Sequence, residues 1–299
     1  MSSFTQTTEP PMALAAIEGD PRNPYRDAAR KLRARPMAMA GAIILVFFIV
    51  LAVFAPVIAP YDPNEISRDR RAAPTREHPF GTDELGRDVL SRVIHGARVS
   101  LRVGLIAVAI ALVFGAVLGI SAAYFGGWFD TVVMRVMDIM LAFPGILLAI
   151  AIIAILGPSL TNAMIAIGIE AIPVYTRTAR ASTLTVKELE YVVGAKALGS
   201  PAPRILFRHI LPNITTPLIV LATVGVAGSI LTAAGLSYLG LGAQPPTAEW
   251  GAMLSSSRSY LRDCWWMATF PGIAIVMVVL SLNLFGDGLR DMLDPRMRR

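Results

Sequence analysis

The chain has 299 residues, of which 55% are apolar and only 16% are charged. This composition is too apolar for a typical soluble domain, and the apolar residues stand in uninterrupted blocks, which argues against a cytosolic enzyme. The formal net charge of +6 suits the anionic cytoplasmic face of a bilayer better than nucleic acid. The single cysteine, Cys264, has no partner for an internal disulfide and excludes a zinc site built from several cysteines.

The predicted membrane spans follow from six apolar blocks. A hydrocarbon core about 30 Å thick needs roughly 20 helical residues. Five blocks contain no Asp, Glu, Lys or Arg and are long enough: residues 37–59, 103–125, 139–160, 214–241 and 264–286. A sixth block, 160–175, carries Glu170 and Pro173, but without it the two most basic late segments would lie on opposite sides of the membrane. The sequence therefore predicts an all-α polytopic membrane protein with six transmembrane helices.

The Lys and Arg residues of the connecting segments predict the orientation. Segments on one side hold 16 of them, in residues 1–36, 177–212 and 287–299, whereas those on the other side, 60–99 and 242–263, hold 9. Because basic residues concentrate in cytoplasmic loops, both termini are expected in the cytoplasm. The chain then divides into a cytoplasmic arm 1–36, a first transmembrane helix 37–59, an external loop with an amphipathic helix 60–102, a five-helix core 103–290 that includes a cytoplasmic hairpin 177–212, and a cytoplasmic tail 291–299.

The chain carries no motif for chemistry of its own. The phosphate-binding loop of many ATPases needs a lysine directly after a glycine, and none of the three lysines, Lys31, Lys187 and Lys196, follows one. The three histidines lie far apart, without the spacing of metal ligands. We therefore expect no catalytic residue, no metal site and no cofactor bound by this chain.

Three charged residues fall within the predicted spans: Arg135 and Asp138 near the start of the third, and Glu170 in the fourth. Charges are costly in lipid, so these side chains should face protein or water. They indicate either an ion relay or a structural ion pair near the cytoplasmic rim. We favour a pair between Arg135 and Glu170, since both lie at similar depth. A face of small residues in the second span predicts close helix packing: Ala111, Gly115 and Gly119.

The segment between the fourth and fifth spans has the pattern of helix, glycine turn and helix. Residues 187–198 predict the first helix, and Gly199 suits a left-handed turn after it. Ser200 is placed to cap the second helix, and Pro212 is placed to end it before the fifth span. The sequence therefore predicts a helical hairpin on the cytoplasmic side.

The second helix of this hairpin is amphipathic. Arg204 and Arg208 give it a basic side, and the other side is apolar, formed by Ile205, Leu206, Ile210 and Leu211. A hairpin with such faces fits a groove on another protein. The alternative is a surface hairpin held by anionic lipid.

The hairpin sequence EYVVGAKALGSPAPRILFRHILPN resembles the EAA loop of inner-membrane permease subunits in binding-protein-dependent ABC importers. Three further stretches, at 80–104, 236–254 and 286–298, are similar to the dipeptide, oligopeptide and nickel branch, in its "C"-type permease subunit. The loop departs from the family where Val193, Gly194 and Ala195 replace the usual Glu-Ala-Ala, so the eponymous glutamate is missing.

This resemblance implies a MetI-like fold in a bacterial-type inner membrane. It also implies a homologous permease partner in a heterodimer, two cytoplasmic ATPase subunits that bind ATP and Mg²⁺, and an external solute-binding protein. Di- or oligopeptides are the expected substrate, and nickel or another small solute is the alternative within the family. The resemblance assigns ATPase coupling to Glu190, Ala195, Lys196, Ala197, Leu198, Gly199, Ser200, Arg204, Arg208 and Pro212. An ion-coupled secondary transporter that uses Arg135, Asp138 and Glu170 is the alternative from another class.

The external loop 60–102 contains apolar residues at helical spacing between positions 89 and 101. This pattern predicts a helix that lies on the membrane surface. A contact with the solute-binding protein is an equal alternative, and its candidate residues are Asp83, Arg87, Asp88 and Arg92.

Overall fold

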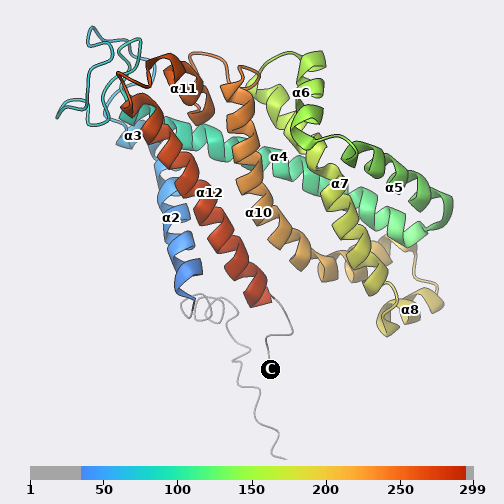
Figure 1. Cartoon of the computed structure of the whole chain (residues 1–299). Helices are drawn as coiled ribbons and strands as arrows, with labels where there is room; N and C mark the ends of the chain where they lie inside the picture. Colours follow the sequence, from blue (N-terminus) through green and yellow to red (C-terminus); the bar gives the residue numbers. More distant parts are fainter. Residues whose placement is uncertain (1–34, 294–299) are drawn as a thin grey trace, which may run out of the picture.

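The computed structural model describes residues 35–293, which form a helical bundle without a β-strand (Figure 1). Its helices are α2 (Pro36–Val53), α3 (Ala55–Ile58), α4 (Val89–Phe125), α5 (Gly127–Leu141), α6 (Gly145–Leu156), α7 (Leu160–Val186), α8 (Glu190–Ala197), α9 (Ala202–Ile205), α10 (Leu211–Tyr238), α11 (Trp250–Ser257) and α12 (Trp266–Leu293). The predicted all-α class is thereby confirmed. The predicted arm 1–36 and tail 291–299 lie outside the described residues except at their inner ends.

Four helical segments of the described chain are long and apolar enough to cross a membrane: α2, α4, the continuous stretch Ala202–Tyr238, and α12. The bent pair of α5 and α6 counts as a fifth if it is taken as one span. Helix α7 has 27 residues, but Glu170 and Arg177 reduce its hydropathy. With α7 included, the arrangement agrees with the six predicted spans.

The third predicted span is broken. Helix α5 ends at Leu141, and α6 begins at Gly145 after a bend of 93°. Pro144 explains the break, because a proline disfavours helical backbone at the residue before it, here Phe143. The apolar block 139–160 was expected to form one transmembrane helix, but the structure divides it between the end of α5 and α6, because hydropathy does not detect a helix-breaking proline.

Helices α4 and α7 pack closely along their length through the predicted face of small residues. A Cβ atom added at Gly115 would overlap Tyr175, and one added at Gly119 would overlap the Thr176 carbonyl and Ala179. Ala111 is also fully buried. The prediction of close helix packing on this face is therefore confirmed.

The amphipathic helix predicted within residues 60–102 is the beginning of α4. Asp88 caps this helix by accepting a hydrogen bond from the Ser91 amide at 2.7 Å, and the helix continues without interruption through residue 103. Its apolar face is covered by other helices of the same chain rather than by lipid. The prediction of a helix on the membrane surface was therefore wrong. A periodic apolar face indicates that one side of a helix is buried, but not whether lipid or protein covers it.

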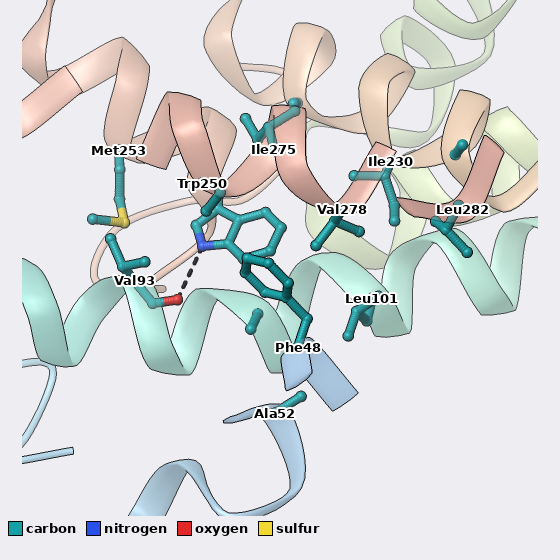
Figure 2. Close-up of a cluster of buried hydrophobic side chains, with 14 of the residues drawn as sticks. Phe48, Ala52, Val93, Leu101, Ile230, Trp250, Met253, Ile275, Val278 and Leu282 are labelled. Carbon is teal, nitrogen blue, oxygen red and sulfur yellow. Dashed lines mark hydrogen bonds between the residues drawn. The ribbon is translucent and has the colours of Figure 1, made fainter. Parts of the chain in front are cut away.

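A buried cluster around Trp250 joins α2, α4, α7, α10, α11 and α12 (Figure 2). The Trp250 side chain is 0% exposed, and its Nε1 donates a hydrogen bond to the Val93 carbonyl at 3.0 Å. The ring of Phe48 from α2 packs edge-on against the indole, with 5.9 Å between ring centroids. Val278 of α12 completes the contact. The short helix α11 is thereby held against α2, α4 and α12.

The two ends of the bundle carry different elements. The beginning of α2 and the end of α12 lie toward the same end as α8, and an ion pair between Arg35 and Asp291 joins them (Figure 1). The loop between α3 and α4 and the helix α11 lie toward the opposite end. This distribution matches the predicted grouping of the segments on two sides of a membrane.

Candidate functional site: the hairpin between α7 and α10

The hairpin is an extension of the long helices. Helix α7 continues past residue 177 to Val186, and α8 follows as a short separate helix. Helix α9 leads through a π-helical turn, Leu206–Ile210, directly into α10. The predicted first helix, 187–198, therefore exists in shortened form as Glu190–Ala197. The second arm of the hairpin is thus continuous with α10, whereas the first follows α7 after a break at residues 187–189.

Gly199 ends α8 in the left-handed conformation that its sequence position predicts. Its φ is +76°, its amide donates to the Lys196 carbonyl at 3.0 Å, and the Ser200 amide donates to the Ala195 carbonyl at 3.1 Å. These two hydrogen bonds form the Schellman arrangement at a helix C-terminus. A Cβ atom at Gly199 would meet nothing within 4 Å, so the backbone conformation alone favours glycine here.

Two details of the predicted hairpin are wrong. Ser200 does not cap the second helix, because α9 begins at Ala202 with Pro201 at the N-cap position. Pro212 does not end that helix either, since it lies in the first turn of α10. The Leu211 amide bonds five residues back to Leu206, and this π-type register admits a proline at the next position without breaking the helix.

The apolar side of the second helix packs against this chain. Ile205 and Ile210 are buried, with Val192 of α8, Val186 of α7 and Ile120 of α4, in one cluster. Lys187 adds a hydrogen bond from its Nζ to the carbonyl of Ala123 at the end of α4, at 3.1 Å. The amphipathic pattern was therefore correct, but its apolar face anchors the hairpin instead of remaining free for a partner.

The outward face of the hairpin combines exposed apolar and charged side chains. Leu198 at the turn is 88% exposed and Phe207 is 71% exposed, and Tyr191 and Val193 are also exposed. The coupling candidates Glu190, Lys196, Ala197, Gly199, Arg204, Arg208 and Pro212 are exposed as well, whereas Ala195 and Ser200 are half-buried. Sequence reasoning missed Tyr191 and Phe207, although both are apolar residues that fall outside the buried stripe.

The expected ion pair between Arg135 and Glu170 is not formed. Asp138 pairs instead with Arg177 at 2.6 Å, and the Arg180 guanidinium binds the Asp130 carboxylate through two hydrogen bonds of 2.6 Å. Among the described residues, Arg135 has no ion-pair partner. The break before α6 bears on this difference, because it places Gly145 against the Glu170 carboxylate.

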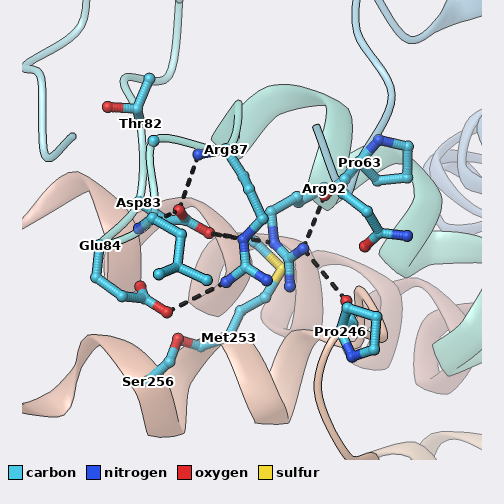
Figure 3. A network of polar contacts seen from close by, with 12 residues as sticks. Pro63, Thr82, Asp83, Glu84, Arg87, Arg92, Pro246, Met253 and Ser256 are labelled. Atoms are coloured by element: carbon cyan, nitrogen blue, oxygen red, sulfur yellow. Dashed lines mark hydrogen bonds and ion pairs between the residues drawn. The ribbon is translucent and has the colours of Figure 1, made fainter. Parts of the chain in front are cut away.

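The four residues considered for an external contact are buried. Asp83, Arg87 and Arg92 belong to one polar network (Figure 3), whereas the Asp88 carboxylate binds His78 and Ser91. Asp83, Arg87, Asp88 and Arg92 are 5%, 6%, 2% and 5% exposed. Arg87 Nε donates to Asp83 Oδ2 at 2.6 Å, and Arg92 Nη1 donates to the carbonyls of Pro63 at 2.8 Å and Pro246 at 3.4 Å. The proposed contact with a solute-binding protein is therefore wrong for these residues, because charges at helical spacing gave no indication of their burial.

A buried carboxylate supports the same end of the bundle. Glu249 caps α11 by accepting hydrogen bonds from the amides of Gly251 at 3.0 Å and Ala252 at 2.9 Å. Burial raises the pKa of Glu249, and these hydrogen bonds oppose that rise. Trp266 Nε1 donates a hydrogen bond to the Thr82 carbonyl at 3.1 Å, which attaches the loop between α3 and α4 to α12. The segment between α3 and α4 is thus a fixed cap rather than a loose loop.

An apolar helical bundle with a fixed cap at one end and an anchored helical hairpin at the other is the fold of a polytopic membrane protein. The family model described as "Binding-protein-dependent transport system inner membrane component" matches residues 115–299. A second model, "N-terminal TM domain of oligopeptide transport permease C", matches residues 23–75. The chain belongs to the family of inner-membrane components of binding-protein-dependent transport systems. It is a non-catalytic permease subunit of an ABC transporter.

Similar proteins cover nearly the whole chain. The dipeptide transport system permease protein DppC of Alkalihalophilus pseudofirmus is 50% identical over 92% of this chain and 91% of that protein. The di/tripeptide permease protein DppC of Pseudomonas aeruginosa is 47% identical over 87% and 88%, respectively. The glutathione permease protein GsiD of Escherichia coli O157:H7 is 45% identical over 93% and 92%.

The fold has a counterpart among solved structures. A chain of the MetNI methionine ABC transporter in an inward-facing conformation matches with a TM-score of 0.55 and 17% identity. The match covers 68% of this chain and 96% of that chain. The expected MetI-like fold is therefore confirmed.

Proposed function

We propose that this chain forms half of a translocation pathway for di- or oligopeptides in an ATP-driven importer. A homologous permease subunit supplies the other half, and an external solute-binding protein delivers the peptide. The observation that carries this proposal is similarity over nearly the full length to permease proteins named for dipeptide, di/tripeptide and glutathione transport. Alternating access then comes from rigid-body rocking of the two subunits around a site between them.

Two cytoplasmic ATPase subunits, which bind ATP and Mg²⁺, drive this motion, and one of them seats on the hairpin. The outward face supports this role, because exposed apolar side chains such as Leu198 and Phe207 stand beside the basic Arg204 and Arg208. A mixed apolar and basic face suits a groove on a protein better than a lipid surface alone. The buried inner face transmits the motion, since it is continuous with α4 and α7.

The hairpin, the beginning of α2 and the end of α12 are assigned to the cytoplasmic side. The segments on that side hold 16 Lys and Arg residues against 9 on the other. The cap formed by the loop before α4 and by α11 then faces outward, where it meets the solute-binding protein. Both termini are cytoplasmic in this arrangement.

Uptake into proteoliposomes tests the proposal. The complete assembly, with the binding protein outside the vesicles and ATP at the ATPase subunits, should take up a labelled dipeptide. An assembly whose ATPase subunits lack their phosphate-binding lysine is the control and should take up none. Uptake of Ni²⁺ without uptake of peptide would identify nickel, rather than a peptide, as the substrate. Uptake by this chain alone under an ion gradient would identify it as a secondary transporter.

A further inference from the structure

We propose that Glu170 of α7, whose carboxylate lies beside the bend between α5 and α6, binds the ammonium group of the peptide as the peptide passes through the translocation pathway. This inference rests on the peptide substrate proposed above. It assigns a substrate contact to a carboxylate that neither the coupling hairpin nor the external cap uses. The argument comes from its depth, its surroundings and its lack of a partner.

With Leu160 at the outer edge of the span, Glu170 lies near the middle of the membrane rather than at the cytoplasmic rim expected from the sequence. It is ten residues along α7 from Leu160, which corresponds to about 15 Å at 1.5 Å per residue, in a hydrocarbon core of about 30 Å. Gly145 is at a similar distance from the end of α6 at Leu156. The bend between α5 and α6 therefore brings an interrupted helix to the membrane midplane, which is where transporters place substrate sites.

The chain makes room for this carboxylate but gives it no partner. A Cβ atom at Gly145 would overlap Glu170 Oε1, so the carboxylate lies directly against the backbone at the beginning of α6, and a larger residue there would displace the flexible Glu170 side chain. The two arginines further along α7 are already engaged, Arg177 by Asp138 and Arg180 by Asp130. Within residues 35–293, Glu170 forms no ion pair and no side-chain hydrogen bond.

A half-buried carboxylate at this depth must face water or a partner rather than lipid, because a charge in hydrocarbon is costly. It lies on the side of α7 that faces α6, away from the core that α7 shares with α4. Because this chain covers the Glu170 side chain only in part, water or a second subunit completes its surroundings.

The chemistry of the site fits an ammonium group. The described residues contain no cluster of three His, Cys, Asp or Glu side chains, so Glu170 has no companions for binding a divalent metal. The adjacent beginning of α6 carries partial positive charge, which is complementary to a carboxylate. Peptides of any sequence share an α-ammonium group, so one carboxylate serves many of them.

The competing occupant is a basic side chain of the partner permease, and the experiment separates the two. The core complex of two permease and two ATPase subunits, without binding protein, is mixed with a dipeptide or its N-acetylated form, and binding is measured by ligand-observed NMR. Leaving out the binding protein removes its own selectivity. The wild type should bind the free dipeptide at least about tenfold more tightly than the acetylated one, the size expected for a charged hydrogen bond.

Glu170→Gln should bind both peptides equally, and Glu170→Asp should retain part of the preference. Glu65→Gln, the same change at an exposed acid of the loop before α4, is the matched control and should behave as the wild type. The inference fails if Glu170→Gln keeps the wild-type preference for the free dipeptide, or if the wild type shows no preference. It also fails if the variant lowers the affinity for both peptides by the same factor, because that result indicates a contact between Glu170 and the partner subunit. If this inference fails but the assembly still takes up peptide, the proposed function stands. If the assembly takes up no peptide, both the proposed function and this inference are wrong.

Discussion

Gly199→Val should leave the chain folded and inserted but abolish the stimulation of ATP hydrolysis by substrate in the assembled complex. The φ of +76° at this position costs a residue with a side chain roughly 1–2 kcal/mol, and a β-branched residue is the least suited to it. The strain is relieved by unwinding the end of α8, which moves Leu198 and the outward face. ATPase docking should weaken, as measured by the amount of ATPase subunit that co-purifies with the permease.

Gly199→Asn is the matched control, because asparagine is similar in size to valine but adopts the left-handed conformation more readily. It should retain most of the stimulation. Gly194→Ala, within α8, should be close to neutral, since a Cβ atom there meets nothing within 4 Å. Equal damage by Asn and Val at position 199 would show that the added side chain, rather than the backbone conformation, disturbs docking.

Asp83→Asn should destabilise the subunit by about 3–5 kcal/mol, because it leaves the buried guanidinium of Arg87 without its closest counter-charge. The amide isostere still accepts the hydrogen bonds that the amides of Leu85 and Arg87 donate to Asp83 Oδ1 at 2.9 Å. The loss of stability therefore measures the effect of removing the charge rather than an effect on the turn. It should appear as a lower unfolding temperature of the purified subunit, followed by tryptophan fluorescence in mild detergent.

Asp69→Asn is the control, since Asp69 is an exposed acid of the same loop and should change stability by less than about 0.5 kcal/mol. The double variant with Asp83→Asn and Arg87→Met should lose less than the two single changes together, because the unpaired charge is removed. An Asp83→Asn subunit as stable as the wild type would mean that Glu84, which lies 3.1 Å from Arg87 Nη2, fully replaces Asp83.

Local sequence signals predicted the parts of this structure that depend on neighbouring residues. Gly199 indicated a left-handed helix end because few other residues adopt that conformation, and the face around Gly115 and Gly119 indicated close packing because only small side chains permit it. The apolar blocks predicted most spans for the same reason, since hydropathy is a property of the segment itself. These features need no knowledge of distant contacts.

The parts that were wrong depend on contacts between distant segments. The pattern of Val89 and Val93 predicted an apolar face, but Trp250 and Phe48, which cover it, are remote in sequence. The pairing of Asp138 with Arg177 depends on how α5, which ends before the break at Pro144, packs against α7, and the positions of the charges in the sequence do not specify that packing. Pro144 was the one signal in the sequence that could have predicted the break.

Accessibility of the hairpin tip tests the account most directly. Leu198→Cys, in a background with the buried Cys264 replaced by alanine, places one reactive thiol at an 88% exposed position. A membrane-impermeant maleimide should not label it in right-side-out vesicles but should label it in inverted vesicles stripped of ATPase subunits. Rebinding the ATPase subunits should block that labelling. Labelling from the outside, or labelling that the ATPase subunits leave unchanged, would contradict the proposal that the hairpin is the cytoplasmic seat of the ATPase.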